Sequence, residues 1–221
     1  MGEVDNDKVE RVFDRLARHY ERQMTRVEKL VLGPAREWAV SHARGRVLEI
    51  AVGSGLNLAL YGDDVTSVVG VDLSSEMLDL ARAKVVDADR IELRQGDVQA
   101  LDLPDASVDT VVSTYTYCTI PDPGRASAEA YRVLVPGGRI VLAEHGPSTN
   151  SIVRVVMRAV EPLAVLLDAD HLTRDPVPYL RDAGFTVDDV QRTGRGGIVF
   201  RVLAHKPVEI AGGSADSLRA G

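Results

Sequence analysis

Val47-Leu48-Glu49-Ile50-Ala51-Val52-Gly53-Ser54-Gly55 is the stretch that decides the fold. Its first half is an apolar run typical of a buried strand, and its glycines predict a turn in which a ligand can approach the backbone closely. A second apolar run ends in Asp72, about 17 residues past Gly55, near the spacing of an acid that binds a ribose. Together they predict a nucleoside-binding crevice at the carboxyl ends of parallel strands.

The composition is that of one domain with an ordinary core. The chain has 221 residues, of which 45% are hydrophobic and 27% are charged. Its net charge of −7 argues against a general nucleic-acid-binding protein, so we expect no nucleic-acid partner. Cys118 is the one cysteine, which excludes an internal disulfide. The acidic, polar start does not have the pattern of a signal peptide, and no apolar window is long enough to span a membrane. We therefore expect a cytoplasmic location.

Alternating strand and helix patterns predict an α/β fold with a doubly wound, mainly parallel sheet. The predicted strands are 46–51, 67–72, 91–94, 108–113, 139–143, 185–190 and 198–204. The predicted helices are 8–31, 34–42, 56–60, one that begins at Ser74, 125–134, 151–167 and 175–183. The connection between the last two strands is too short for a parallel crossover, which predicts an antiparallel hairpin at the edge of the sheet.

We expect a helical cap at 1–43, a main domain at 44–205 with a helical insertion at 150–175, and a disordered tail at 206–221. Five residues of the insertion share one helical face: Val153, Val156, Met157, Val160 and Ala164. Packing into the core over the sheet explains this face. The alternatives are a lid that supplies an apolar wall and a surface that transiently contacts a membrane.

The glycine pattern separates the candidate cofactors. A nicotinamide-binding fold needs a third glycine where this chain has Leu58, and Ala51 stands where a first glycine would be. A nucleoside cofactor without phosphates needs only the close backbone approach and the ribose acid. After the third predicted strand, Asp97 can accept a hydrogen bond from an adenine amino group, while the amide of Val98 donates to the ring. The alternative for Asp97 is that it caps a turn.

These motifs, followed by Val135-Pro136-Gly137-Gly138, resemble the class I S-adenosylmethionine-dependent methyltransferases. The chain is most similar to the type 11 branch, which includes ubiquinone and menaquinone biosynthesis methyltransferases and phospholipid N-methyltransferases. The resemblance extends over about residues 10–205. It implies a seven-stranded Rossmann-like sheet, S-adenosyl-L-methionine as cofactor and methyl transfer as the reaction. Ala51 departs from the family, which more often has glycine at that position.

The resemblance implies contacts with the methionine part of the cofactor. Glu49 would organise the loop and the region of the cofactor amino group. The backbone at Ala51, Gly53 and Gly55 would line the methionine moiety. Asn57 would either cap the first helix or reach the cofactor carboxylate, and capping is the favoured role.

The resemblance also implies contacts with the adenosine part. Asp72 would hold the ribose hydroxyls. Leu73 and Met77 would lie against the adenine ring. Asp97 and Val98 would read the adenine edge.

Three further residues complete the implied cofactor site. Ser113 and Thr114 would lie below the sulfonium, at the end of the fourth strand. Tyr20 would cover the cofactor from the N-terminal helix, and its alternative role is packing on the apolar face of that helix.

Two residues are candidates for catalysis. His145 is the best general base, because its ordinary pKa of about 6.5 suits proton removal near neutral pH. Tyr115 would shape the acceptor pocket. The alternatives are a structural histidine and a packing tyrosine. Cys118 is expected to be a buried small side chain rather than a nucleophile, and no metal site is predicted.

Glu144-His145 with the later Leu172-Thr173-Arg174 also resembles the alkyl thiol methyltransferases of microsomal membranes, whose N-terminal membrane anchor we do not expect here. The acceptor is therefore expected to be a small, apolar molecule: a thiol, a quinone-like ring or a lipid amine. The alternative functions are a non-catalytic S-adenosylmethionine-binding protein and, less favoured, an NAD-binding oxidoreductase.

Overall fold

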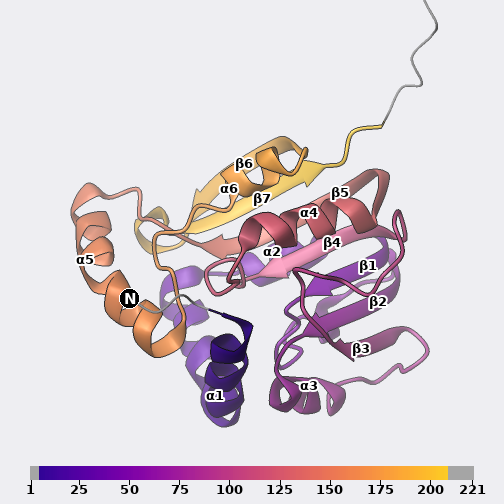
Figure 1. Cartoon of the computed structure of the whole chain (residues 1–221), viewed down its shortest axis with the longest axis horizontal. Helices are drawn as coiled ribbons and strands as arrows, with labels where there is room; N and C mark the ends of the chain where they lie inside the picture. The colour runs from indigo at the N-terminus through magenta and orange to yellow at the C-terminus, as the bar shows by residue number, and fades with distance from the viewer. Residues whose placement is uncertain (1–4, 209–221) are drawn as a thin grey trace, which may run out of the picture.

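A seven-stranded sheet organises the computed structural model, which describes residues 5–208 (Figure 1). Its strands, in the order β3-β2-β1-β4-β5-β7-β6, span Ile91–Gln95, Val65–Asp72, Gly45–Ile50, Val108–Thr114, Leu134–His145, Val199–His205 and Thr186–Thr193. The first five strands of the chain pair in parallel, whereas β7 is antiparallel to both β5 and β6. The predicted sheet and its closing edge hairpin are confirmed.

Helices cover both faces of this sheet. The helices are α1 (Asn6–Val27), α2 (Ala35–Ser41), α3 (Ser75–Arg82), α4 (Pro123–Val133), α5 (Ser151–Asp168) and α6 (Val177–Asp182). Short turns of other helix types are η1 (Glu28–Leu32), η2 (Leu58–Leu60) and η3 (Arg195–Gly197). Buried side chains of α4 and α6 belong to one hydrophobic cluster, and those of α2 and α3 to a second. No helix within 5–208 is both long and apolar enough to cross a membrane.

The strand β1 shows how the sequence fixes this arrangement. Leu48 and Ile50 belong to the cluster with α4 and α6, whereas Val47 belongs to the cluster with α2 and α3. All three side chains are buried, as expected when successive residues of a central strand point to opposite, covered faces. The apolar run therefore fixes β1 between two layers of helices and leaves its carboxyl end at the edge of the sheet.

The predicted helix at 56–60 is wrong. The segment contains only the single turn η2, and Gly55 before it has a φ of 77°. A Cβ at Gly55 would lie 2.8 Å from Leu58 Cδ1 and 3.1 Å from Ala81 Cα, so the backbone is folded tightly against α3. Five residues separate Gly55 from Tyr61, whose hydroxyl is bonded to Glu49, and they leave no room for a longer helix.

Two other helix boundaries differ from the prediction. The helix predicted at 8–31 is α1 followed by the π-helical turn η1. The helix predicted at 125–134 begins at Pro123, after the N-cap Asp122, and ends at Val133, so that residues 134–138 belong to β5.

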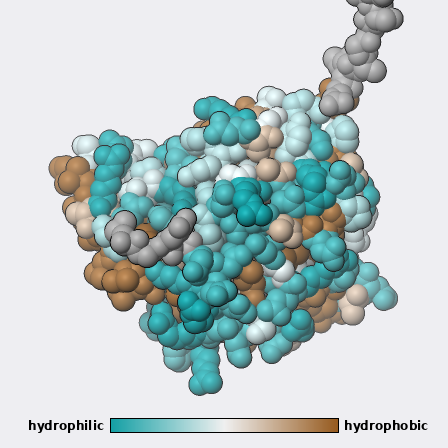
Figure 2. Space-filling view, viewed as in Figure 1, coloured by the Kyte–Doolittle hydropathy of each residue, from teal (hydrophilic) through white to brown (hydrophobic). Residues whose placement is uncertain are grey.

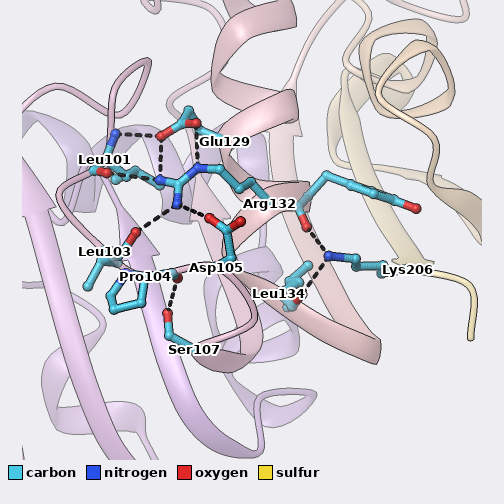
Figure 3. A network of polar contacts seen from close by, with 10 residues as sticks. Leu101, Leu103, Pro104, Asp105, Ser107, Glu129, Arg132, Leu134 and Lys206 are labelled. Carbon is cyan, nitrogen blue, oxygen red and sulfur yellow. Dashed lines mark hydrogen bonds and ion pairs between the residues drawn. The ribbon is translucent and has the colours of Figure 1, made fainter.

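Lys206 lies in the predicted tail but packs on the domain. Its Nζ donates hydrogen bonds of 2.8 Å to the carbonyls of Tyr131 and Leu134 (Figure 3). Residues 209–221 of that tail lie outside the described residues, as do residues 1–4.

Arg132 of α4 holds the loop between β3 and β4 against the helix (Figure 3). Its guanidinium donates hydrogen bonds of 2.7–2.9 Å to the carbonyls of Leu101 and Leu103 and to the carboxylates of Asp105 and Glu129. The same loop begins with Asp97 and Val98, so Arg132 fixes the segment that follows these two residues.

We expect Arg132→Met to lower the free energy of unfolding by about 1–2 kcal/mol, because charge-assisted hydrogen bonds to the loop are lost. Urea denaturation followed by circular dichroism measures the effect. Arg125→Met, at an exposed position of the same helix, is the matched control and should change the free energy by less than about 0.5 kcal/mol. Equal losses in the two variants would contradict the structural role of Arg132.

Glu144 joins the carboxyl ends of β4 and β5. Its carboxylate is fully buried and accepts hydrogen bonds from Ser113 Oγ at 2.6 Å and from the backbone N–H groups of Thr116 and Tyr117 at 2.7 and 3.1 Å. These bonds fix the turn that follows β4. Burial nevertheless raises the pKa of Glu144 from 4.5 to about 7.

A raised pKa means that the folded protein keeps the Glu144 proton where the unfolded chain has lost it. Glu144 therefore makes the free energy of unfolding decrease as pH rises from 4.5 to about 7. We expect Glu144→Gln to flatten this decrease in urea denaturations between about pH 5 and pH 7. Its amide oxygen can still accept from the N–H groups of Thr116 and Tyr117, and its NH2 group can donate to Ser113 Oγ. Glu76→Gln, at an exposed position of α3, is the control. An unchanged slope in Glu144→Gln would mean that Glu144 is ionised in the folded protein throughout this range.

Candidate functional site

The candidate site lies where the strand order of the sheet changes direction. The strand β1 lies between β2 and β4, and open α/β sheets bind ligands beside the carboxyl ends of the strands at such a point. A cavity is found here, which we call the inner cavity. It brings together ten of the residues predicted from the sequence: Tyr20, Ala51, Gly53, Asp72, Leu73, Met77, Asp97, Val98, Thr114 and Tyr115.

Asp72, at the end of β2, ties the two predicted motifs together. Its Oδ2 accepts a hydrogen bond of 2.8 Å from the N–H of Gly53, and its Oδ1 accepts one of 2.9 Å from the N–H of Ser74. The side chain is buried, and burial raises its pKa to about 6. A carboxylate has about four acceptor positions, so lone pairs remain for hydroxyl groups of a ligand.

Asp97 is engaged by two partners. Its Oδ1 accepts hydrogen bonds from the backbone N–H and the Nε2 of Gln99, at 2.8 and 2.9 Å, which is the turn contact that the sequence offered as the alternative. Its Oδ2 accepts a hydrogen bond of 2.7 Å from Nδ2 of Asn6, the first residue of α1. An adenine amino group would therefore share Asp97 with Asn6 or replace it.

Two residues that are not glycine take left-handed conformations at the cavity wall. Ala51 follows β1 with a φ of 51°, and Tyr115 follows β4 with a φ of 58°. Side chains other than glycine rarely adopt this conformation, and such strain is concentrated at functional sites. The positive φ of Ala51 also explains why the family that the sequence resembles more often has glycine here, because glycine adopts this conformation without strain.

Glu49, below the glycine turn, is almost fully buried. It accepts hydrogen bonds of 2.8 Å from Asn57 Nδ2 and from the hydroxyl of Tyr61, and burial raises its pKa to about 7. Its carboxylate thus fixes both ends of the segment after the turn. Its role toward the cofactor amino group stays a prediction.

The favoured capping role of Asn57 is wrong. Its side chain makes no cap hydrogen bond to η2 and instead contacts Glu49, Thr114 and Arg36. Like Asn57 and Glu49, two other predicted residues lie outside the inner cavity wall. Gly55 packs against α3, and Ser113 is buried with its hydroxyl bonded to Glu144.

Arg36 is a buried residue of the site that the sequence reasoning missed. Its guanidinium donates to the carboxylate of Glu28, to Asn57 Oδ1 at 2.9 Å and to Thr114 Oγ1 at 2.9 Å. Burial alone would lower its pKa, but Glu28 outweighs burial and raises it. Arg36 also lines a small side cavity beside Ala51. In the sequence it is one arginine of the predicted helix 34–42, and no pattern within that helix marks it as a site residue.

A second cavity of about 440 Å³, which we call the outer cavity, adjoins the first. The two share four lining residues: Phe13, Tyr20, Tyr115 and Thr119. Most other residues around the outer cavity are apolar and come from α1, η1 and the segments at 157 and 172. Tyr20 and Tyr115, which the sequence singled out, therefore form part of the wall between the cavities.

His145, Cys118 and Asp170 converge on the outer cavity. One donor atom from each residue lies within 4.8 Å of the others, and His145 Nε2 is 3.2 Å from Asp170 Oδ1. Cys118 is buried, as the sequence predicts, and burial raises the pKa of its thiol to about 11. The three side chains could hold a metal ion, and without one they form an imidazole–carboxylate pair beside a neutral thiol.

The environment of His145 favours the imidazolium form. Burial alone would lower its pKa, but Cys118 and Asp170 outweigh burial and raise it well above 6.5. Because the thiol is neutral near pH 7, we attribute the effect in that range to Asp170. The pKa of Asp170 is itself lowered, since the contact with His145 outweighs burial. His145 is therefore neutral, and able to accept a proton, only at a pH well above its ordinary pKa of about 6.5.

The helix α1 closes the inner cavity through polar contacts along its length. In addition to the contact between Asn6 and Asp97, Ser74 Oγ donates a hydrogen bond of 2.5 Å to Asp14, and Lys84 contacts Glu21. Val9, Phe13 and Tyr20 of α1 line the cavity beneath these contacts. The helix is therefore a wall of the site as well as a cap.

The comparisons with known proteins agree with this geometry. Residues 48–142 match the family described as a methyltransferase domain. The chain is 43% identical over 122 residues to phosphatidylethanolamine N-methyltransferase of Cereibacter sphaeroides, covering 53% of this chain and 60% of the relative. It is 36% identical over 162 residues to demethylmenaquinone methyltransferase of Deinococcus radiodurans, covering 68% and 65%. The chain thus spans less than two thirds of the length of these two relatives.

A longer match is to demethylmenaquinone methyltransferase of Paenarthrobacter aurescens, with 30% identity over 233 residues, covering 92% of this chain and 88% of the relative. Among solved structures, a methyltransferase of Thermotoga maritima has a TM-score of 0.69 at 23% identity, covering 89% of this chain and 99% of that one. One of Mesorhizobium loti has a TM-score of 0.61 at 21% identity, covering 78% and 96%. With the site and these relatives in view, the chain belongs to the class I S-adenosylmethionine-dependent methyltransferase family.

Proposed function

We propose that this chain transfers a methyl group from S-adenosylmethionine in the inner cavity to a small, apolar acceptor in the outer cavity. The observation that carries the proposal is the shared wall of the two cavities. One cavity has a ribose-type acid at its edge. The other is mainly apolar and contains an imidazole–carboxylate pair. A donor and an acceptor held in adjoining cavities can react without diffusing through water.

In this proposal the inner cavity binds the cofactor by its two polar ends. Asp72 accepts hydrogen bonds from the ribose hydroxyls, and Asp97 accepts one from the adenine amino group. The guanidinium of Arg36 attracts the carboxylate of the methionine moiety, because a buried arginine binds carboxylates well. Support comes from the positions of these side chains at the inner cavity and its side cavity.

The cofactor supplies an activated methyl group, so the protein must orient the acceptor and exclude water. Tyr20 and Tyr115 separate the cavities and limit the path of approach. His145 accepts the proton of an acceptor hydroxyl, thiol or amine, and Asp170 orients the imidazole and stabilises its charge. The apolar lining of the outer cavity favours a quinol-like ring, a thiol or a lipid amine over a polar metabolite. The names of the relatives include a lipid and a quinone type of acceptor.

Asp72→Asn tests the cofactor site. The variant removes the negative charge that receives the ribose hydroxyls, so we expect the affinity for S-adenosylhomocysteine to fall about tenfold or more in isothermal titration calorimetry. Asp79→Asn, on an exposed part of α3, is the matched control and should bind normally. If a folded Asp72→Asn protein binds as tightly as the control, Asp72 does not hold the cofactor.

The pH dependence of turnover tests the catalytic pair. Screening thiols, quinols and lipid amines with methyl-labelled cofactor first identifies an acceptor. We then expect kcat to rise with pH as the raised pKa of His145 is passed. Asp170→Asn should move this rise to lower pH, because the charge that holds the proton on His145 is removed.

His145→Gln should abolish the rise and reduce kcat by about a hundredfold. Gln191→Glu, on the exposed strand β6, is a control for nonspecific charge effects. An Asp170→Asn profile that coincides with the unsubstituted protein would exclude the imidazole–carboxylate pair from the reaction.

A further inference from the structure

The helix α5 presents an apolar face to solvent. Only Val165 of this helix is buried, so the predicted packing of the insertion into the core is wrong. Eight large apolar residues of α5 are exposed: Ile152, Val153, Val155, Val156, Val160, Leu163, Leu166 and Leu167. At 3.6 residues per turn they fall within an arc of about 160°. Figure 2 shows hydrophobic residues gathered at the end of the molecule where Figure 1 places α5.

The neighbouring helix α1 has a basic stripe. Seven cationic residues recur at intervals of three or four along α1 and η1: Lys8, Arg11, Arg15, Arg18, Arg22, Arg26 and Lys29. All except Lys8 are exposed. This concentration is unexpected in a chain with a net charge of −7.

Three acidic residues of α1, Glu10, Asp14 and Glu21, lie on a different side of the helix. Glu10 and Asp14 contact Gln95 and Ser74, next to the inner cavity, and Glu21 pairs with Lys84. Within residues 5–208, no arginine of the stripe forms an ion pair with an acidic residue of α1, and Arg15 has its acidic neighbour, Asp168, on α5.

The stripe and the apolar face border each other. Lys8 Nζ donates a hydrogen bond of 2.8 Å to the carbonyl of Val165, and Arg15 donates one of 3.2 Å to the carbonyl of Leu167. Arg15 also lies 4.0 Å from the carboxylate of Asp168. Figure 1 shows α1 and α5 next to each other at one end of the molecule. An apolar face edged by cations is the pattern of a helix that lies in the interface of an anionic membrane.

We propose that the apolar face of α5 and the basic stripe of α1 together bind the surface of an anionic lipid bilayer. Charge and hydrophobicity favour this occupant over the others. A second copy of the chain would bring two basic stripes close together across a symmetric interface, and like charges repel. A nucleic acid would contact the stripe but leave the eight apolar side chains in water.

The same surface would bring the outer cavity next to a membrane that contains the methyl acceptor. Phe13 and Leu16 of α1 and Met157 of α5 line that cavity, so it lies between the two helices that contact the bilayer. An apolar acceptor dissolved in the membrane could then enter without crossing water. This last step rests on the proposed function, whereas bilayer binding does not.

Vesicle sedimentation tests the inference with the full chain. We expect binding to vesicles of phosphatidylcholine with about a third phosphatidylglycerol, weak binding to phosphatidylcholine alone, and loss of binding as salt screens the stripe. Leu163→Glu and the double variant Arg18→Glu/Arg22→Glu should each reduce the partition coefficient at least tenfold. Val86→Glu replaces a valine that is 95% exposed outside this surface, and this matched control should bind as the unsubstituted protein does.

The outcomes that overturn the inference are distinct. Equal binding to neutral and anionic vesicles, or equal binding by Leu163→Glu and Val86→Glu, would exclude the proposed surface. A dimer in light scattering that Leu163→Glu dissociates would show that a second copy covers α5. Binding of duplex DNA that only the arginine variant loses would assign the stripe to nucleic acid. The vesicle assay uses no acceptor, so failure of methyl transfer does not affect its result, and calorimetry with S-adenosylhomocysteine checks that each variant is folded.

Discussion

The hydrogen bonds between Asp72 and the N–H groups of Gly53 and Ser74 are the constraint on which the site depends. They join the carboxyl ends of β1 and β2 through a buried carboxylate, which costs free energy unless it is well bonded. Burial raises the pKa of this group to about 6. The fold therefore holds at the edge of its sheet an acid with unused acceptor positions. Ligand hydroxyl groups would stabilise its charged form.

The helix α1 connects the parts of the molecule that the cofactor, the acceptor and the environment would contact. One side lines both cavities through Phe13 and Tyr20. A second side is bonded to the loops of the inner cavity through Asn6 and Asp14. A third side carries the basic stripe. The same helix therefore carries the basic stripe and the contacts that close the inner cavity.

Much of the fold could be predicted because its strands are apolar runs bounded by glycine turns and acids. Gly53 lies in the turn after one such run and Asp72 at the end of the next. The structure brings these two residues together, as the sequence predicts. The short segment 56–60 was mispredicted because apolar residues alone do not distinguish a helix from a single turn. Gly55 and the buried network of Asn57 decide that case.

Other features depend on contacts between distant segments and could not be read from local patterns. Arg36 is separated in sequence from both Asn57 and Thr114, and nothing in its own helix predicts that it reaches them. The helical pattern of α5 predicts an apolar face but not whether that face points to the sheet or to solvent. The basic spacing of α1 was visible in the sequence, but its place beside α5 was not.

A crystal structure of the protein with S-adenosylhomocysteine tests directly whether Asp72 holds the cofactor. We expect the ribose hydroxyls to lie within hydrogen-bond distance of the Asp72 carboxylate and the sulfur to face the wall shared with the outer cavity. A nucleoside bound elsewhere on the protein, with Asp72 bonded only to the backbone, would contradict it.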